Sequence, residues 1–274
     1  MSVINTNTKS LMARNALTVN NRALENTMQQ LSTGKRINSA ADDAAGLAIS
    51  NKMTSQIKGL DQAVRNANDA ISVAQTAEGA TQEITSMLQR MRELSIQAVN
   101  DSNTSSDRTA LQAEVTELTS EIDRIAANTE FNGMALLTGS AGTSGVMTFQ
   151  VGANESQTID VTFENMAISA LGVSALDIST ASGAASAITT IDTAIASVDS
   201  FRADLGAKVN RFTHAIDNLT SVSQATQGAR SRVLDTDYAA ATTELARTQI
   251  IQQAGTAMLA QANQAPQSVL SLLK

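Results

Sequence analysis

Residues 53–74 read MTSQIKGLDQAVRNANDAISVA and decide the fold class of the chain. Apolar residues recur in this stretch at alternating spacings of three and four. Such heptad spacing holds one apolar stripe of an α-helix against a partner helix. The stripe consists of Met53, Ile57, Leu60, Val64, Ala67, Ile71 and Ala74.

The same helix is predicted to continue beyond this stretch. The apolar pattern slips around Glu78, which indicates a stutter inside one helix. It resumes at Ile84, Leu88, Met91 and Ala98. A helix over about 45–99 would be roughly 80 Å long, whereas a compact globule of 274 residues would be about 50 Å across. We therefore expect an elongated molecule.

Two further apolar stripes predict a three-stranded helical bundle. Polar residues 100–107, NDSNTSSD, supply a turn and an N-cap before a second helix that returns along the first. The third stripe has one gap, at Arg202, which the neighbouring Phe201 fills. The second stripe is Leu111, Val115, Leu118, Ile122 and Ile125, and the third is Ile188, Ile191, Ile195, Val198, Leu205, Val209, Phe212, Ile216 and Leu219. The expected bundle seam comprises Ile57, Leu60, Val64, Ile71, Leu118, Ile122, Val209, Phe212 and Ile216.

The middle of the chain, residues 131–183, has a different character and is rich in Gly, Ser and Thr. Apolar and polar residues alternate in two short runs, with GANES between them. Alternation with period two on either side of a turn predicts a β-hairpin. The alternating residues are Met147, Phe149 and Val151 in the first run and Ile159, Val161 and Phe163 in the second.

The terminal segments, 1–40 and 235–274, mix Asn, Gln, Thr and Ala with thinly spread Leu, Ile and Met. Such weakly amphipathic segments are marginal as isolated helices. Two interpretations are open: frayed tails, or a pair of helices that order on packing against each other and against neighbouring subunits. The fold class predicted is mainly α, an elongated helical bundle and coiled coil built from the N- and C-terminal segments with a small β-hairpin region.

Composition argues against several classes of protein. Aromatic residues make up 2% of the chain, with one Pro and no Cys. Sparse turn residues disfavour sandwiches, barrels and repeated α/β units, and the lack of Cys excludes disulfides and thiolate metal sites. The net charge is −7, and residues 131–200 hold six acidic and no basic side chains, which argues against nucleic-acid binding. Neither an apolar run of membrane-spanning length nor a signal-peptide pattern is visible, so we expect no membrane insertion.

No catalytic, cofactor or metal site is predicted, and we expect no enzyme activity. His214 is the only His and lies on the flank of the third stripe. Ser55 and Lys58 form an S-x-x-K pattern without its companion motifs. A charged cluster can suggest acid–base chemistry, but we expect it to supply salt bridges and helix caps at an inter-domain junction. The cluster comprises Lys35, Arg36, Asp42 and Asp43.

Long segments at both ends resemble bacterial flagellin. The N-terminal match includes LSTGKRINSAADDAAGLAISNKMTSQIKGL at 31–60, RNANDAISVAQTAEGA at 65–80 and LQRMRELSIQAVN at 88–100. The C-terminal match is ARSRVLDTDYAAATTELARTQIIQQAGTAMLAQANQAPQSVLSLLK at 229–274. The resemblance implies a short form without large outer domains. Its inner coiled coil would be 1–42 with 235–274, and its outer bundle 43–234, including a hairpin region at about 138–183.

The resemblance also implies a function and a set of partners. It implies a structural subunit that self-polymerises into the extracellular flagellar filament for swimming motility. Export would run through the flagellar type III apparatus with a secretion chaperone, and the cap and hook-junction proteins would be further partners. A hook–filament junction protein of the same lattice is the alternative, and a filament protein with an enzymatic insert is disfavoured by the short middle segment.

Two groups of residues acquire expected roles from the resemblance. One face carries Arg90, Leu94, Gln97 and Glu114, which match residues that contact Toll-like receptor 5 in some flagellins; an axial contact between subunits is the competing interpretation. The second group is the terminal segment for assembly and chaperone binding, with Leu245, Ile250, Ile251, Met258 and Leu270.

Overall fold

The computed structural model describes residues 6–271, with side chains described through residue 264. The described chain is mainly α, as the heptad pattern predicted. Its five helices are α1 (Thr8–Thr33), α2 (Ala44–Val99), α3 (Ser105–Asn128), α4 (Ala181–Leu234) and α5 (Tyr238–Ser271). Its short strands are β1 (Glu130–Phe131), β2 (Met134–Ala135), β3 (Val146–Gln150) and β4 (Thr158–Thr162).

The chain divides into two compact units. The first takes in the chain up to Ser55 and from Ala225 onward, and the second is Gln56–Gln224. The first unit therefore contains α1 and α5 together with the first turns of α2 and the last turns of α4. We expected the terminal unit to be 1–42 with 235–274, which contains no part of α2 or α4; the division in the structure lies further along both helices.

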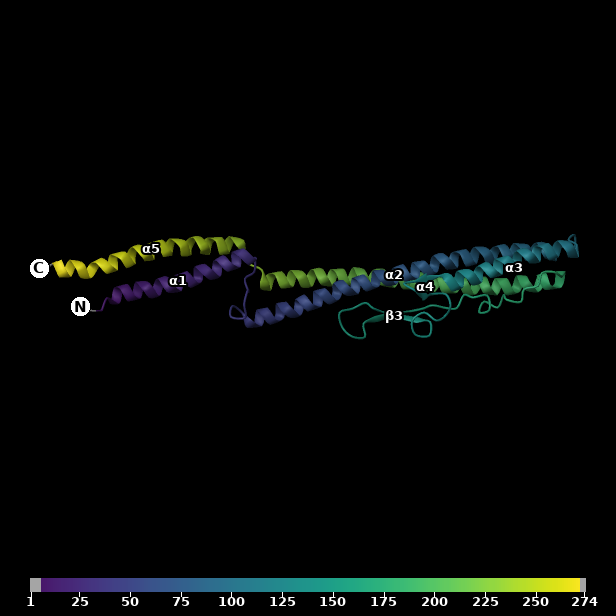
Figure 1. Ribbon diagram of the computed structural model, residues 1–274, viewed down its shortest axis with the longest axis horizontal. Helices are drawn as coiled ribbons and strands as arrows, with labels where there is room; N and C mark the ends of the chain where they lie inside the picture. Colours follow the sequence, from purple (N-terminus) through teal and green to yellow (C-terminus); the bar gives the residue numbers. More distant parts are fainter. Residues whose placement is uncertain (1–5, 272–274) are drawn as a thin grey trace. The chain divides into compact units, whose positions relative to one another are not determined.

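In the second unit, α2, α3 and α4 run side by side (Figure 1) and share one apolar core. Contacts between α2 and α4 join Asp61 to Ser223 and Arg92 to Asp192, so residue numbers rise along one helix as they fall along the other. The two helices are thus antiparallel. Phe201 is 3% exposed and does fill the gap that the polar Arg202 leaves in the third stripe.

The apolar stripe of α2 passes the predicted stutter without a break. Ala77 and Thr81, on either side of Glu78, are both fully buried and keep the spacing of three and four. The Thr81 hydroxyl donates to the carbonyl of Ala77 at 3.0 Å, which satisfies its polar group inside the core. A buried Thr therefore continues the stripe that the sequence showed as interrupted.

The turn between α2 and α3 is closed by side chains. Thr104 is the N-cap of α3 and forms a capping box with Asp107, as the polar stretch before α3 predicted. Arg108 donates from Nε to the carbonyl of Ala98 at 2.7 Å and from Nη2 to Asn100 at 3.2 Å. The first bond satisfies a carbonyl in the last turn of α2 that has no partner within the helix, and the second reaches the residue just after the helix end.

The predicted β-hairpin is present. β3 pairs antiparallel with β4, with Met147 opposite Val161 and Phe149 opposite Ile159. Two aromatic contacts fix the hairpin region to α4: Phe149 meets Phe212 at a ring distance of 5.8 Å, and Phe163 meets Phe201 at 6.5 Å. The scarce aromatic residues are therefore concentrated where the hairpin packs on the bundle.

The sequence analysis missed a second, smaller hairpin. β1 pairs with β2 across Asn132 and Gly133, both of which have positive φ angles, 52° and 76°. Asn-Gly is a strong signal for a two-residue hairpin turn, because both residues tolerate the left-handed conformation. The signal was therefore readable in the sequence.

In the first unit, α1 and α5 lie side by side and run antiparallel (Figure 1). Hydrogen bonds join Asn7 to Ala262 at 2.7 Å and Tyr238 to Leu31 at 3.1 Å, so the N-terminal end of α1 meets the C-terminal part of α5. The terminal segments thus form a pair of helices, as one of the two sequence interpretations proposed.

Candidate functional site

The seam between α1 and α5 contains buried polar side chains. Asn20, Thr27 and Thr248 are all buried, and the Asn20 amide donates to the carbonyl of Thr248 at 2.8 Å. A buried polar contact fixes the register of two helices, because any slip leaves the polar group without a partner. These residues were missed in the sequence, since a polar residue between two thin apolar stripes reads as exposed.

Apolar side chains on both terminal helices face solvent instead. The two buried side chains of α1 among those described are polar, whereas Leu17, Leu24 and Leu31 are half-buried. Apolar groups that gather on a surface favour binding of another protein, and both helices keep large exposed apolar side chains. On α1 they are Leu11, Met12, Val19 and Met28, and on α5 they are Tyr238, Ile250, Ile251 and Met258, with exposed fractions from 41% to 73%.

The expected terminal assembly residues lie partly on this surface. Ile250 is 66% exposed, Ile251 41% and Met258 65%, whereas Leu245 is half-buried. The side chain of Leu270 lies outside the described residues. The sequence named only the C-terminal half of the surface, and the structure adds the exposed residues of α1 beside it.

The charged cluster at 35–43 lies within the first unit and forms caps and cross-connections. The backbone N–H of Arg36 donates to the carbonyl of Leu234 at 2.7 Å, and its guanidinium donates to the carbonyl of Val233 at 2.7 Å. The Arg36–Asp43 ion pair is long, at 4.0 Å, and both partners are exposed. Lys35 contributes through a backbone bridge to Asp235.

The two aspartates of this cluster hold the backbone around the start of α2. Asp42 accepts the backbone N–H groups of Ser39 at 2.8 Å and Asn38 at 3.0 Å, which lowers the pKa of its carboxyl group. Asp43 accepts the N–H of Gly46 at 2.8 Å, in the first turn of α2. Both carboxylates are occupied by backbone donors, which favours a structural role over acid–base chemistry.

Of the face that carries Arg90, three residues are exposed and one is not. The Arg90 guanidinium donates to Glu114 on α3 at 2.9 Å and to Glu93 at 3.1 Å, and these bonds raise its pKa above the ordinary value. Gln97 is exposed as well. Leu94, however, is 1% exposed and belongs to the core between the helices. The exposed surface expected there is therefore made by Arg90, Gln97 and Glu114, whereas Leu94 lies buried in the core.

The expected seam residues are all buried or half-buried. Buried are Ile57, Leu60, Ile122 and Phe212. Half-buried and packed against a core cluster are Val64, Ile71, Leu118, Val209 and Ile216.

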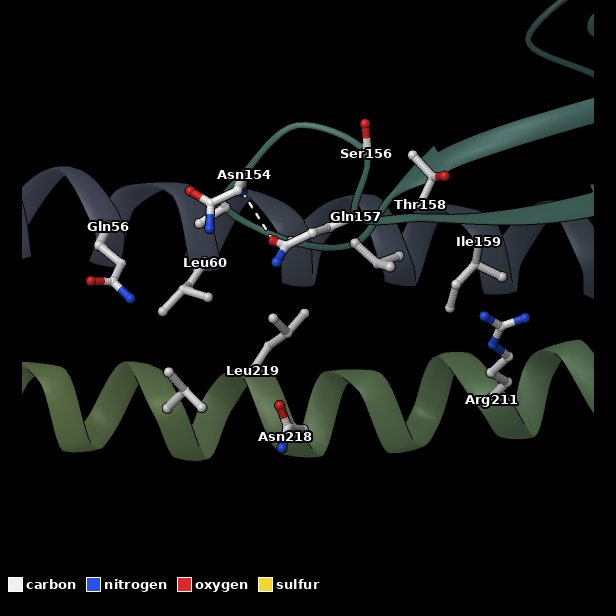
Figure 2. Close-up of a pocket in the computed structure, with 14 residues that line it drawn as sticks. Gln56, Leu60, Asn154, Ser156, Gln157, Thr158, Ile159, Arg211, Asn218 and Leu219 are labelled. Atoms are coloured by element: carbon white, nitrogen blue, oxygen red, sulfur yellow. Dashed lines mark hydrogen bonds between the residues drawn. The ribbon is translucent and has the colours of Figure 1, made fainter.

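A groove of about 470 Å³ lies beside the tip of the larger hairpin (Figure 2). Gln56 and Leu60 come from α2 and Arg211, Asn218 and Leu219 from α4, facing the loop 151–158 (Figure 2). The loop is closed by a bond from the backbone N–H of Asn154 to the side-chain oxygen of Gln157 at 3.0 Å. The lining mixes amide groups with apolar side chains and carries one charge, that of Arg211.

Neither metal-ligand clusters nor membrane spans are found in the described part of the chain. Within residues 6–271, no three His, Cys, Asp or Glu side chains gather in a way that would hold a metal ion. His214 is exposed on α4, in agreement with the flank position expected. Over the same residues, no helix has the length and apolarity to cross a bilayer.

These features define a mainly helical protein whose two ends pair and leave apolar side chains exposed. Residues 4–142 match the family of the bacterial flagellin N-terminal helical region, and residues 188–273 match the bacterial flagellin C-terminal helical region. The chain belongs to the bacterial flagellin family.

Individual relatives agree with the family match. A flagellin of Halalkalibacterium halodurans is 46% identical over 274 residues, covering 99% of this chain and all of the relative. The flagellar filament 33 kDa core protein of Treponema phagedenis is 44% identical over 285 residues, covering 99% of this chain and all of that protein. A short form is thus shared by known members.

Solved structures share the fold. The crystal structure of Bacillus cereus flagellin is 31% identical, with a TM-score of 0.52, covering 57% of this chain and 88% of that chain. A flagellar hook-associated protein from Vibrio parahaemolyticus has a TM-score of 0.61 at 15% identity, covering 71% of this chain and 100% of that chain. The second likeness concerns the fold alone and does not favour a junction role.

Proposed function

We propose that this chain is a structural subunit that self-polymerises into the extracellular bacterial flagellar filament. The observation that carries the proposal is the exposed apolar surface on α1 and α5, which the pairing of the two helices leaves uncovered. Burial of apolar surface is worth roughly 25 cal/mol per Å². Neighbouring copies that cover these side chains therefore gain stability that the single chain lacks, and assembly becomes cooperative.

Electron microscopy of the purified chain under polymerising conditions tests this function. We expect long tubes with a narrow lumen, since a repeated contact between identical subunits that does not close builds a helical polymer. A stable oligomer of fixed size would contradict the proposal. Motility in a host that lacks its own filament subunit gives the biological counterpart, and restored swimming is the expected result.

Export and chaperone binding complete the proposal. The subunit leaves the cell through the flagellar type III apparatus, and a secretion chaperone holds the segment around Leu245 to Leu270 before export. The exposure of Ile250, Ile251 and Met258 supports this, because these groups need cover in the free subunit. Pull-down by the chaperone of a wild-type chain but not of an Ile250→Ser/Met258→Ser variant tests it, and equal capture of both would contradict it.

The Arg90 surface is proposed as the contact for Toll-like receptor 5 in the free subunit, with axial packing between subunits as its role in the filament. Its exposed, ion-paired arrangement with Glu114 supports a contact surface. Arg90→Ala and Gln97→Ala are expected to weaken receptor signalling. Arg124→Ala is the matched control, because Arg124 is also exposed and ion-paired, with Glu121, in the same unit. Unchanged signalling by the first two variants would contradict the receptor role.

A further inference from the structure

The described methionines of this chain differ widely in exposure. Met12 is 73% exposed, Met258 65% and Met28 56%, and all three lie on α1 or α5. Met91 and Met166, in the second unit, are at most 1% exposed. The most accessible thioether sulfurs described in the chain are therefore concentrated on the terminal helices.

A thioether reacts with hydrogen peroxide in one two-electron step. The sulfur lone pair attacks one peroxide oxygen, the O–O bond breaks, and the sulfur keeps that oxygen as a sulfoxide. The other oxygen leaves as water once it has taken the remaining proton. Access to the sulfur governs the reaction, so exposed side chains react first, and the product is polar where the side chain was apolar.

Two of these methionines, Met12 and Met258, share a helix face with another exposed apolar residue. Met12 and Val19 lie seven residues apart on one face of α1, and Ile251 and Met258 do the same on α5. Both members of each pair are exposed. A sulfoxide placed there must be desolvated when a second copy covers the face, and burying a polar group without a hydrogen-bond partner is costly.

We propose that Met12, Met28 and Met258 are oxidation-sensitive positions at which hydrogen peroxide converts the free subunit into a form that does not polymerise. The proposal rests on the proposed function. The filament protects these positions, since the neighbouring copies that cover the apolar faces also exclude the peroxide. Reduction of the sulfoxides restores the subunit.

The test treats the full-length soluble chain with hydrogen peroxide and follows each methionine by peptide mass spectrometry. Met12, Met28 and Met258 are expected to gain oxygen well before Met91 and Met166, which serve as internal standards. The same peroxide dose applied to assembled filaments is expected to leave the terminal methionines largely unmodified. Equal oxidation of buried and terminal methionines in the free chain would overturn the proposal.

Polymerisation is measured on the same samples by sedimentation. Oxidation is expected to raise the concentration needed for polymerisation by about tenfold or more, as the burial of an unpaired polar group implies. A Met12→Leu/Met28→Leu/Met258→Leu variant is expected to polymerise equally well before and after treatment. It retains Met134, 38% exposed on β2, so it also shows whether oxidation outside the terminal helices matters.

The outcomes separate this proposal from the proposed function. If the untreated wild-type chain does not polymerise, the proposed function fails and the assembly step falls with it. If the untreated chain polymerises and the oxidised chain does so at the same concentration, the oxidation proposal alone is refuted. Should the leucine variant polymerise poorly, recovery of the oxidised wild type after treatment with methionine sulfoxide reductases decides the matter, and no recovery would contradict the proposal.

Discussion

Single side chains set the ends of the helices and the contacts between them. At the start of α3, Thr104 and Asp107 bond reciprocally, and these bonds lower the pKa of Asp107. At the end of α2, Arg108 donates to a carbonyl of the last turn. In the core of the second unit, Phe212 is fully buried and holds Phe149 of the hairpin.

The capping box predicts a dependence of stability on pH. Because the pKa of Asp107 is lower in the folded chain than in the unfolded one, its contribution is present above roughly pH 3.9, the ordinary value, and is lost as pH falls through the folded pKa. Asp107→Asn should therefore be less stable than wild type at neutral pH, with the difference shrinking in acid. Urea unfolding over this pH range measures it, and a difference that does not vary with pH would contradict the assignment.

The N-cap itself is tested by Thr104→Ala. Loss of the capping hydroxyl should cost about 1 kcal/mol of unfolding free energy. Ser106→Ala is the matched control, because Ser106 is exposed two residues further on and its side chain is not the cap. Equal effects of the two changes would show that the cap contributes nothing of its own.

Phe212 predicts a large effect on stability. Phe212→Ala removes a fully buried ring and its edge contact with Phe149, and should cost roughly 3–5 kcal/mol. His214→Ala, at an exposed position two residues away on the same helix, should change stability by less than about 0.5 kcal/mol. Thermal unfolding of both variants gives the comparison; a mild effect at Phe212 would mean that the hairpin is not anchored there.

At the scale of the elements, periodicity explains why the helices and the larger hairpin were predictable. Heptad spacing on α2 and α4 indicates which faces of the helices are buried. Alternation of apolar and polar residues indicates the strands β3 and β4. The apolar pattern slips around Glu78 in the sequence because Thr81 is a polar residue that is nevertheless buried. The same spacing could have placed Leu94 in the core, three residues after Met91, but the resemblance to receptor-binding proteins led us to expect Leu94 on the surface.

The contacts that could not be predicted depend on which helices pair, and periodicity along one helix does not show this. The buried Asn20 and Thr248 are recognisable only once α1 and α5 are paired, since each satisfies its polar groups through bonds that the sequence does not show. Likewise, the hydroxyl of Tyr238 donates to Leu31, some two hundred positions away in the sequence. Contacts of this kind define the terminal unit, which explains why that unit was left open between two interpretations.

Two glycines of α2 predict opposite responses to the same substitution. Gly79 has open space where a Cβ would lie, so Gly79→Ala should stabilise the helix by up to about 1 kcal/mol. At Gly46 a Cβ would collide with the Asp43 carboxylate and lie 2.6 Å from Ile37, so Gly46→Ala should destabilise the chain. Thermal unfolding compares the two variants, and a shift of the same sign in both would contradict this account of the helix start.

At the scale of the whole molecule, the two units differ in what they bury. The second unit encloses large apolar and aromatic side chains, whereas the helices of the first bury polar contacts in their seam and leave large apolar groups exposed. We expect a protein organised in this way to gain further apolar burial from neighbouring copies. The terminal segments contain thinly spread large apolar residues, which is consistent with assembly as the step that completes their packing.

Polar substitutions on the terminal helices should separate assembly from folding. A Val19→Ser/Ile250→Ser variant should keep the unfolding temperature of the single chain, because both side chains are more than 60% exposed. It should need a higher concentration to polymerise. Ile96→Ser, at an exposed position on α2 in the second unit, should have a smaller effect on polymerisation. Sedimentation after seeding measures all three, and equal yields would count against the terminal surface.

The central claim is that identical copies of this chain build a filament through the apolar surface of α1 and α5. Electron cryo-microscopy of the polymerised wild-type chain tests it most directly. The account predicts helical tubes in which Met12, Val19, Ile250 and Met258 are covered by neighbouring subunits. Discrete oligomers, or tubes in which these side chains still face solvent, would contradict it.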